Sequence, residues 1–267
     1  MCGPRERRSK NALFVLAHQD DEVFLSTRIE RERRSGHVVW CAFLTDGRAR
    51  GADSARRNAE SRRVLGRLAV DPDHVLFAGS EQGIPDGDLP HHLEASLGVL
   101  SGRLAGVAVE RVYTTAYEGG HQDHDAAHLV ALAFAGARGL IGRTWQAPTY
   151  NGFRMPWRLF RVQQPLAGPR RRCIRRLDAR AALHHALLPA HYPSQWSAWM
   201  GLWPGLALER LALRRETLLA VDLARARRRP HEGPLLYERR TAWTYAAFAT
   251  AAAPFIAHHL TEIVPLP

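Results

Sequence analysis

The chain contains few cysteines, a single lysine and no apolar run that reads plainly as a membrane span. Its three cysteines (Cys2, Cys41 and Cys173) have no paired spacing, which argues against a disulfide framework and against a thiolate zinc site. So little cysteine favours a reducing compartment, and we expect the protein in the cytoplasm. Lys10 is the only lysine, so arginine supplies nearly all of the 37 basic residues.

The formal net charge is +11, a value that ordinarily suggests a polyanionic partner. Arginine in place of lysine, together with abundant alanine, is also typical of a GC-rich genome, and this weakens the charge as an argument. No recognised nucleic-acid-binding module accompanies it. We therefore expect no nucleic-acid partner, while a basic nucleic-acid-binding protein with a vestigial pocket remains a distant alternative.

The apolar segments also speak against membrane insertion. The first one is short and ends in acids, unlike a signal peptide. Residues 242–260 are long enough to raise the question, but they contain Pro254 and end near His258 and His259. We expect a terminal helix packed on the body of the protein, and no membrane partner.

The first half of the chain alternates between strand and helix patterns. Apolar runs lie at 13–17, 38–44, 75–78 and 111–116, and helical patterns follow at 21–34, 54–68, 93–104 and 126–137. This alternation predicts an α/β fold: a Rossmann-like, mostly parallel sheet flanked by helices on both faces. A hydrophobic content of 46% and a charged content of 24% are ordinary for a globular protein.

The pattern weakens after about residue 145. Residues 151–180 mix aromatics and prolines with an arginine cluster from Arg170 to Arg176. A substrate-covering segment, a nucleic-acid surface and a solvated linker all fit this composition. We expect a single domain over 1–267, in which 11–145 form an α/β core and the less regular region 146–267 completes the cleft.

Two clusters of histidine and acid follow predicted strands. His18 to Glu22 read His-Gln-Asp-Asp-Glu after the first strand, and His121 to Asp125 read His-Gln-Asp-His-Asp after the fourth. Either cluster alone could simply cap a helix. In an open parallel sheet, however, ligands bind beyond the carboxyl ends of the strands, so both clusters should converge. Burying so many acids is costly unless a cation or hydrogen bonds compensate, and His with Asp is a normal ligand set for zinc.

These residues carry a resemblance to a known family. Ala17 to Glu22 and His121 to His124 resemble the hallmarks Ala-His-Pro-Asp-Asp-Glu and His-Pro-Asp-His of the zinc-dependent de-N-acetylases of the PIG-L/LmbE type. Both prolines are glutamine here, which removes no functional side chain. Weaker similarities lie at Arg57 to Glu60, Ile84 to Leu89 and Tyr192 to Gln195. The resemblance is good from residue 11 to about 135 and patchy beyond.

The resemblance implies a role for each residue. One Zn²⁺ per chain, or alternatively Fe²⁺, would be bound by His18, Asp21 and His124. Asp20 would transfer protons, and His121, oriented by Asp123, would stabilise the oxyanion. Glu22 would support the site rather than bind the metal.

The resemblance also implies positions that contact the substrate. Arg57 and Asp86 match positions that contact the sugar or polyol of the substrate, although a surface salt bridge or a turn would also explain them. Some family members place a tyrosine just before the second motif, where this chain has Gly119 and Gly120, so Tyr117 is a doubtful substitute. The remaining histidines that we considered are expected not to be ligands: His184, His185, His191, His258 and His259.

The expected function follows from the resemblance. The chain would hydrolyse the N-acetyl group of an N-acetylglucosamine-type conjugate, a secondary metabolite or a thiol precursor, and release acetate and a free amine. An amidase or deacylase acting on a thiol conjugate or a longer N-acyl chain is the main alternative. The partner is therefore a small-molecule amino-sugar conjugate. The sequence does not fix the oligomeric state.

Overall fold

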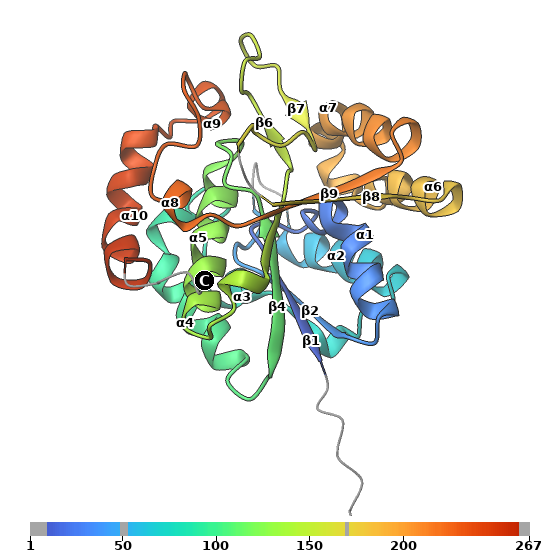
Figure 1. Ribbon diagram of the computed structural model, residues 1–267, viewed down its shortest axis with the longest axis horizontal. Helices are drawn as coiled ribbons and strands as arrows, with labels where there is room; N and C mark the ends of the chain where they lie inside the picture. Colours follow the sequence, from blue (N-terminus) through green and yellow to red (C-terminus); the bar gives the residue numbers. More distant parts are fainter. Residues whose placement is uncertain (1–9, 49–52, 169–170, 262–267) are drawn as a thin grey trace, which may run out of the picture.

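The structure is a computed structural model that describes residues 10–48, 53–168 and 171–261. Cys2 and Arg170 lie outside these ranges. Within them the larger sheet has seven strands in the order β3-β2-β1-β4-β5-β9-β8 (Figure 1). Its strands are β1 (Asn11–Leu16), β2 (Val38–Phe43), β3 (Val75–Leu76), β4 (Val109–Thr115), β5 (Thr144–Ala147), β8 (Arg172–Arg176) and β9 (Arg215–Ala220).

The first five of these strands are parallel, whereas β9 pairs antiparallel with both β5 and β8. The chain runs outward from β1 to β3 and then crosses to β4 on the other side of β1. This reversal creates a crevice at the carboxyl ends of β1 and β4, which is where ligands bind in open α/β sheets.

Helices cover both faces of the sheet because side chains of a buried strand alternate between the faces. In β1, Leu13 and Val15 join one core and Phe14 and Leu16 the other. The first core is closed by α3 (Ala78–Gln82), α4 (Leu93–Arg103), α5 (Gln122–Gly136) and α10 (Tyr245–His259). The second is closed by α1 (Glu22–Arg34), α2 (Ser54–Arg67) and α7 (Trp196–Ala207).

Smaller elements complete the C-terminal region. A short antiparallel pair is formed by β6 (Tyr150–Asn151) and β7 (Arg161–Val162). The remaining helices are α6 (Ala179–Leu187), α8 (Leu223–Ala226), α9 (Leu236–Arg240), the π-helical η7 (Leu208–Ala212) and the short 3-10 helices η2 (Pro72–His74), η3 (Leu89–His91), η4 (Ile141–Arg143), η5 (Leu188–His191) and η6 (Pro193–Gln195).

The predicted fold class is confirmed: a mainly parallel sheet lies between helices. The helix expected over 126–137 begins earlier, at Gln122, because His121 caps it and draws the second motif into its first turn. The expected terminal helix is α10, packed against α4 and α5. No helix in the described ranges combines the length and apolar character needed to cross a membrane.

Candidate metal centre and active site

The first motif is folded into a tight turn by one of its own acids. The Asp21 Oδ2 atom accepts the backbone N–H groups of Ala17 (3.1 Å) and His18 (2.8 Å). Asp21 is also the N-cap of α1. Its carboxylate is therefore held at the end of β1, and its second oxygen, Oδ1, remains available for another partner.

The second motif is placed by the start of α5. His121 is the N-cap, and its Nδ1 atom accepts the backbone N–H of Asp123 (3.2 Å). That hydrogen bond puts the ring proton on Nε2. His124 follows in the first turn of the helix, so its ring reaches across the crevice toward the first motif.

The two motifs meet as the sequence analysis expects. His18, Asp21 and His124 are all buried, and one donor atom from each lies within 4.8 Å of the others. The His124 Nε2 atom is 2.8 Å from Asp21 Oδ1, and His18 Nδ1 is 3.7 Å from Asp21 Oδ2. These three residues form the first group that could hold a metal ion.

The ring of His124 is oriented from behind. Its Nδ1 atom lies 3.3 Å from the Thr149 hydroxyl, which donates to Glu118 Oε1 (3.0 Å). The hydroxyl can then only accept from His124, so the proton is on Nδ1 and the Nε2 lone pair faces Asp21. A lone pair opposite a carboxylate oxygen at 2.8 Å requires a cation or a proton between them. The donor set therefore fits a divalent metal.

Glu118 itself is buried and fully engaged. Its carboxylate also accepts the Thr149 backbone N–H (2.7 Å) and the Asn151 side-chain amide (2.9 Å). Burial raises the pKa of Glu118. This residue was not singled out in the sequence analysis, although it directly precedes the two glycines of the second motif.

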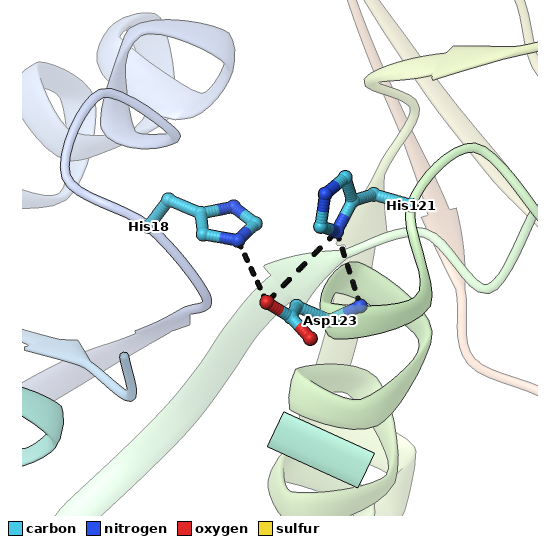
Figure 2. A group of neighbouring side chains, drawn as sticks. All are labelled: His18, His121 and Asp123. Carbon is cyan, nitrogen blue, oxygen red and sulfur yellow. Dashed lines mark hydrogen bonds and ion pairs between the residues drawn. The ribbon is translucent and has the colours of Figure 1, made fainter. Parts of the chain in front are cut away.

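A second group of candidate ligands shares His18 and is drawn in Figure 2. The His18 Nε2 atom is 3.0 Å from Asp123 Oδ2, and His121 Nδ1 is 4.0 Å from the same oxygen. The Asp123 carboxylate already accepts the N–H groups of Gly87 (2.6 Å) and Leu89 (3.1 Å). Asp123 thus holds the 84–89 loop against α5 and orients His121 chiefly through its backbone N–H.

The electrostatics of the crevice favour a cation. Burial opposes a charge on His18, but the carboxylates of Asp86, Asp123 and Asp21 outweigh it and raise the pKa of His18 well above its usual value. Although burial opposes ionisation of Asp21 also, His124 and His18 lower its pKa to about 2.

The pKa values of Asp20 and His121 shift in the opposite sense. Burial raises the pKa of Asp20 to about 8 against the effect of Arg57, with further increases from Asp21 and Glu22. Burial and the neighbouring His18 lower the pKa of His121 to about 4, so the His121 ring is neutral at neutral pH.

Asp20 is a partly buried acid with unusual backbone geometry. Its φ angle is +117°, in a region that non-glycine residues rarely occupy. Its N–H donates to Glu22 Oε2 (2.9 Å), and Glu22 in turn accepts the hydroxyl of Tyr192. Glu22 is thus a supporting residue in this geometry, and Tyr192 explains why the weakly matching segment around it lies near the site.

Arg57 and Asp86 form a buried ion pair, not the surface pair considered as an alternative. The Arg57 side chain donates to Asp86 Oδ2 (3.1 Å), to Gly47 O (2.7 Å) and to Gln19 O (2.5 Å). It also lies 3.5 Å from Asp20 Oδ1. Asp86 Oδ1 is 3.3 Å from His18 Nε2, so the pair belongs to the wall of the site.

The side chains of the site that line one cavity of about 940 Å³ are His18, Asp20, Asp21, Arg57, Asp86, His121 and His124. Sequence reasoning missed much of the remaining wall, which comes from short strands, loops and the helices α7 and α9: Tyr150, Phe160, Gly201, Tyr237, Arg240 and Trp243. Ser194 and Gln195, from the weakly matching C-terminal segment, also line it.

Tyr117 points away from this cavity. It is buried between α5 and α10, with its ring 5.8 Å from that of His128 and 6.3 Å from that of Phe248. A side chain larger than glycine cannot replace Gly120, since a Cβ there would lie 1.9 Å from Tyr150 O. Of the two tyrosines that line the cavity, Tyr150 and Tyr237, it is Tyr150 whose ring packs at 5.3 Å from that of His124.

Comparisons with known proteins agree with this geometry. The PIG-L family profile, described as GlcNAc-PI de-N-acetylase, matches residues 13–135. No curated protein sequence matches the chain.

Several solved structures share the fold. The A40926 pseudoaglycone deacetylase Dbv21 superposes with a TM-score of 0.58 at 16% identity, covering 80% of this chain and 97% of that one. The zinc-inhibited form of teicoplanin deacetylase Orf2 gives 0.56 at 16% identity, over 79% and 97% of the two chains. N,N'-diacetylchitobiose deacetylase from Pyrococcus horikoshii gives 0.51 at 16% identity, over 79% and 82%. Residues 13–135, which include both histidine motifs, match the PIG-L family profile, and the solved structures show that the chain shares their fold.

Proposed function

We propose that the protein is a zinc-dependent de-N-acetylase that acts on an N-acetylglucosamine-type conjugate and releases acetate and a free amine. One observation supports this proposal above the others. Donor atoms of His18, Asp21 and His124 converge at the switch point of the sheet. Asp20, the residue before Asp21, belongs to neither group of candidate metal ligands.

The metal would be held by these three residues. Zinc fits the mixed imidazole and carboxylate donors, and Fe²⁺ is the alternative. When bound, it would supply Lewis-acid polarisation of the acetamide carbonyl and make water a stronger acid.

The chain's own residues would then move the protons. Asp20 would accept the proton of the attacking water and deliver it to the departing nitrogen, so that the C–N bond breaks as the amine leaves neutral. Its raised pKa suits a group that must both accept and return a proton near neutral pH. The ion pair with Arg57 would hold the Asp20 carboxylate toward the cavity.

His121 would stabilise the oxyanion that develops on the acetyl oxygen. Its ring is neutral and its Nδ1 accepts a backbone N–H, so Nε2–H is the group that can donate into the cavity. Asp123 would fix the start of α5 and the 84–89 loop, which places both His121 and Asp86.

The substrate would be larger than one sugar. A cavity of about 940 Å³ lies near the upper end of the range for small-molecule sites. Aromatic side chains such as Tyr150, Phe160 and Trp243 offer flat surfaces to an aglycone. The solved relatives named for a pseudoaglycone and for N,N'-diacetylchitobiose support an amino-sugar conjugate, and we place the reaction in the cytoplasm.

Two substitutions separate metal binding from catalysis. We expect about one zinc ion per purified chain. His124→Ala should lose most of the metal, whereas Asp20→Asn should keep the metal and release acetate from N-acetylglucosamine conjugates about 10²- to 10⁴-fold more slowly. Metal analysis and an acetate assay measure both effects.

The controls are residues of the same type far from the cavity. His258→Ala, on the exposed side of α10, and Asp73→Asn, on the surface at η2, should change neither metal content nor rate. Unchanged turnover in both His124→Ala and Asp20→Asn would show that the site is wrongly assigned. Equal rates across acyl lengths would instead favour a general deacylase.

A further inference from the structure

Exposed apolar side chains are concentrated in one part of the molecule. Among the residues that the structure describes, every large hydrophobic side chain classed as exposed lies between Trp157 and Leu213. None lies among the described residues before Trp157. Isolated exposed hydrophobic residues are normal on protein surfaces, but such a concentration marks an interaction site.

Several of these side chains form a continuous stripe along α7 and η7. Trp196, Met200, Pro204 and Leu208 are exposed at a constant spacing of four residues. That spacing places them on one side of the helix, and the π-helical turns of η7 prolong the alignment. The opposite side of α7 is buried through Trp199, Leu202 and Leu206, so α7 is apolar on both sides.

Helix α6 extends the same surface. It contacts both α7 and η7, and Leu183 and Leu187 are about half exposed. Arg180 precedes them by three and seven residues, so it lies on the same side of α6. Figure 1 shows α6 and α7 together at one end of the long axis, with α10 at the other. We call the exposed side chains Leu183, Leu187, Trp196, Met200 and Leu208 the apolar face.

Arginine dominates the charged residues of the segment that carries the apolar face, and Glu209, which follows Leu208, is buried and paired with Arg215. From residue 153 to 208 the sequence holds nine arginines and a single acid, Asp178. Asp178 is used as the N-cap of α6, where it accepts the Ala181 N–H. Arg176 and Arg214 are exposed and close together, since Leu177 N–H donates to Arg214 O (2.7 Å).

We propose that the apolar face docks on the surface of an anionic lipid membrane. Tryptophan, leucine and methionine flanked by arginine form the composition that lies at the boundary of lipid headgroups and acyl chains. A second copy of the chain would bring two arginine-rich rims together, which disfavours a dimer through this face. Of its five side chains only Trp196 is aromatic, so the face offers nucleic-acid bases a single stacking ring.

This differs from the expectation of no membrane partner, which was argued from the lack of a signal-peptide pattern and of a plain spanning segment. The binding proposed here is peripheral, and it also gives the active-site cavity a defined position. Ser197, Ala198 and Gly201 of α7 line that cavity, while Trp196 and Met200 of the same helix belong to the apolar face. The cavity would therefore open close to the lipid surface, within reach of a conjugate that carries a lipid anchor.

Vesicle sedimentation tests the proposal without any enzyme assay. The full-length protein should bind vesicles of phosphatidylcholine mixed with phosphatidylglycerol at least tenfold more tightly than phosphatidylcholine alone, and salt should weaken the binding. Replacing Trp196, Met200 and Leu208 together by serine should abolish binding. Arg180→Glu combined with Arg214→Glu should weaken it on the order of tenfold or more.

One further measurement and two further variants serve as controls. Thermal unfolding shows whether each variant is folded, and Met200→Glu alone provides a milder version of the triple change. Arg143→Glu is the matched charge control, because Arg143 is exposed before β5, at the end of the sheet opposite the metal site. Absence of binding to anionic vesicles, binding that survives the triple change, or a dimer that the triple change dissociates would each overturn the proposal.

Discussion

At the scale of single residues, Gln19 and Gln122 occupy the positions of the two prolines in the family motifs. Both side chains form hydrogen bonds that hold their motif in place. Gln19 donates to Thr45 O (3.2 Å) and to Asn58 Oδ1 (2.8 Å), and Gln122 donates to Gly87 O (3.0 Å). A proline stiffens a loop by fixing its own φ angle, whereas these glutamines tie each motif to a neighbouring segment. The motifs are therefore held by side-chain hydrogen bonds that the sequence alone does not reveal.

The orientation of His124 gives a prediction at this scale. Thr149→Val removes the hydroxyl that lies between His124 Nδ1 and Glu118 while keeping the shape of the side chain. Because partners of this kind fix the ring and tautomer of a metal ligand, we expect zinc affinity to fall about 10- to 100-fold. A competitive chelator titration measures the change.

Thr144→Val is the matched control. Thr144 is equally buried, and its hydroxyl donates to Leu140 O (2.8 Å), far from the metal site. Both variants should lose about 1 kcal/mol of folding free energy, but only Thr149→Val should alter zinc affinity. Equal affinity in both variants would show that the Thr149 hydroxyl has no effect on the metal ligand.

At the scale of elements, α6 carries a titratable group in its buried side. His185 lies 3.1 Å from Glu30 on α1 and also faces Arg210 of η7 and His184. Burial lowers the pKa of His185 to about 4 even though Glu30 opposes the shift. The unfolded chain therefore binds a proton to this residue at a higher pH than the folded protein does.

This difference in the pKa of His185 determines how the stability of the fold changes with pH. The contribution of His185 is complete above its unfolded pKa of about 6.5 and is lost as the pH falls from there toward about 4. Between pH 7.5 and 5.5, wild type should lose about 1 kcal/mol more unfolding free energy than His185→Gln. Urea unfolding at both pH values measures this, with His184→Gln, on the partly exposed side of α6, as the control. Parallel pH profiles for wild type and His185→Gln would contradict the assignment.

Sequence reasoning succeeded where elements have a clear period and failed where they do not. The strand β1 ends two residues before His18 and β4 ends six residues before His121, so the meeting of the two motifs could be expected from topology. The segment 190–208 contains no charged side chain to mark a polar side, so α7 has no visible amphipathic pattern. Likewise β9 enters the sheet antiparallel at residue 215, a long-range pairing that no local pattern encodes.

At the scale of the whole molecule, the site gathers more acids than the surrounding cations can neutralise. Asp20, Asp21, Asp86 and Asp123 converge from three separate segments, and Arg57 is the buried arginine that pairs with two of them. A bound dication would balance this excess of negative charge. We therefore expect the metal to stabilise the fold as well as the reaction.

Chelation should lower the thermal stability of the whole chain. A metal present at about 1,000 times its dissociation constant contributes roughly 4 kcal/mol, which corresponds to a shift on the order of 10 °C for a protein of this size. Thermal unfolding with and without EDTA measures the shift. His124→Ala, which lacks a ligand, should show little response to EDTA. A wild-type melting temperature that EDTA leaves unchanged would argue that no metal is bound.

The cavity wall extends from His18 near one end of the chain to Trp243 near the other. On the ribosome, His18 is made 225 residues before Trp243. At ordinary elongation rates this interval lasts roughly 10 to 45 s. During that interval the turn after β1 can exist without the walls that later enclose it. The binding site is therefore completed well after its first candidate ligand has been made.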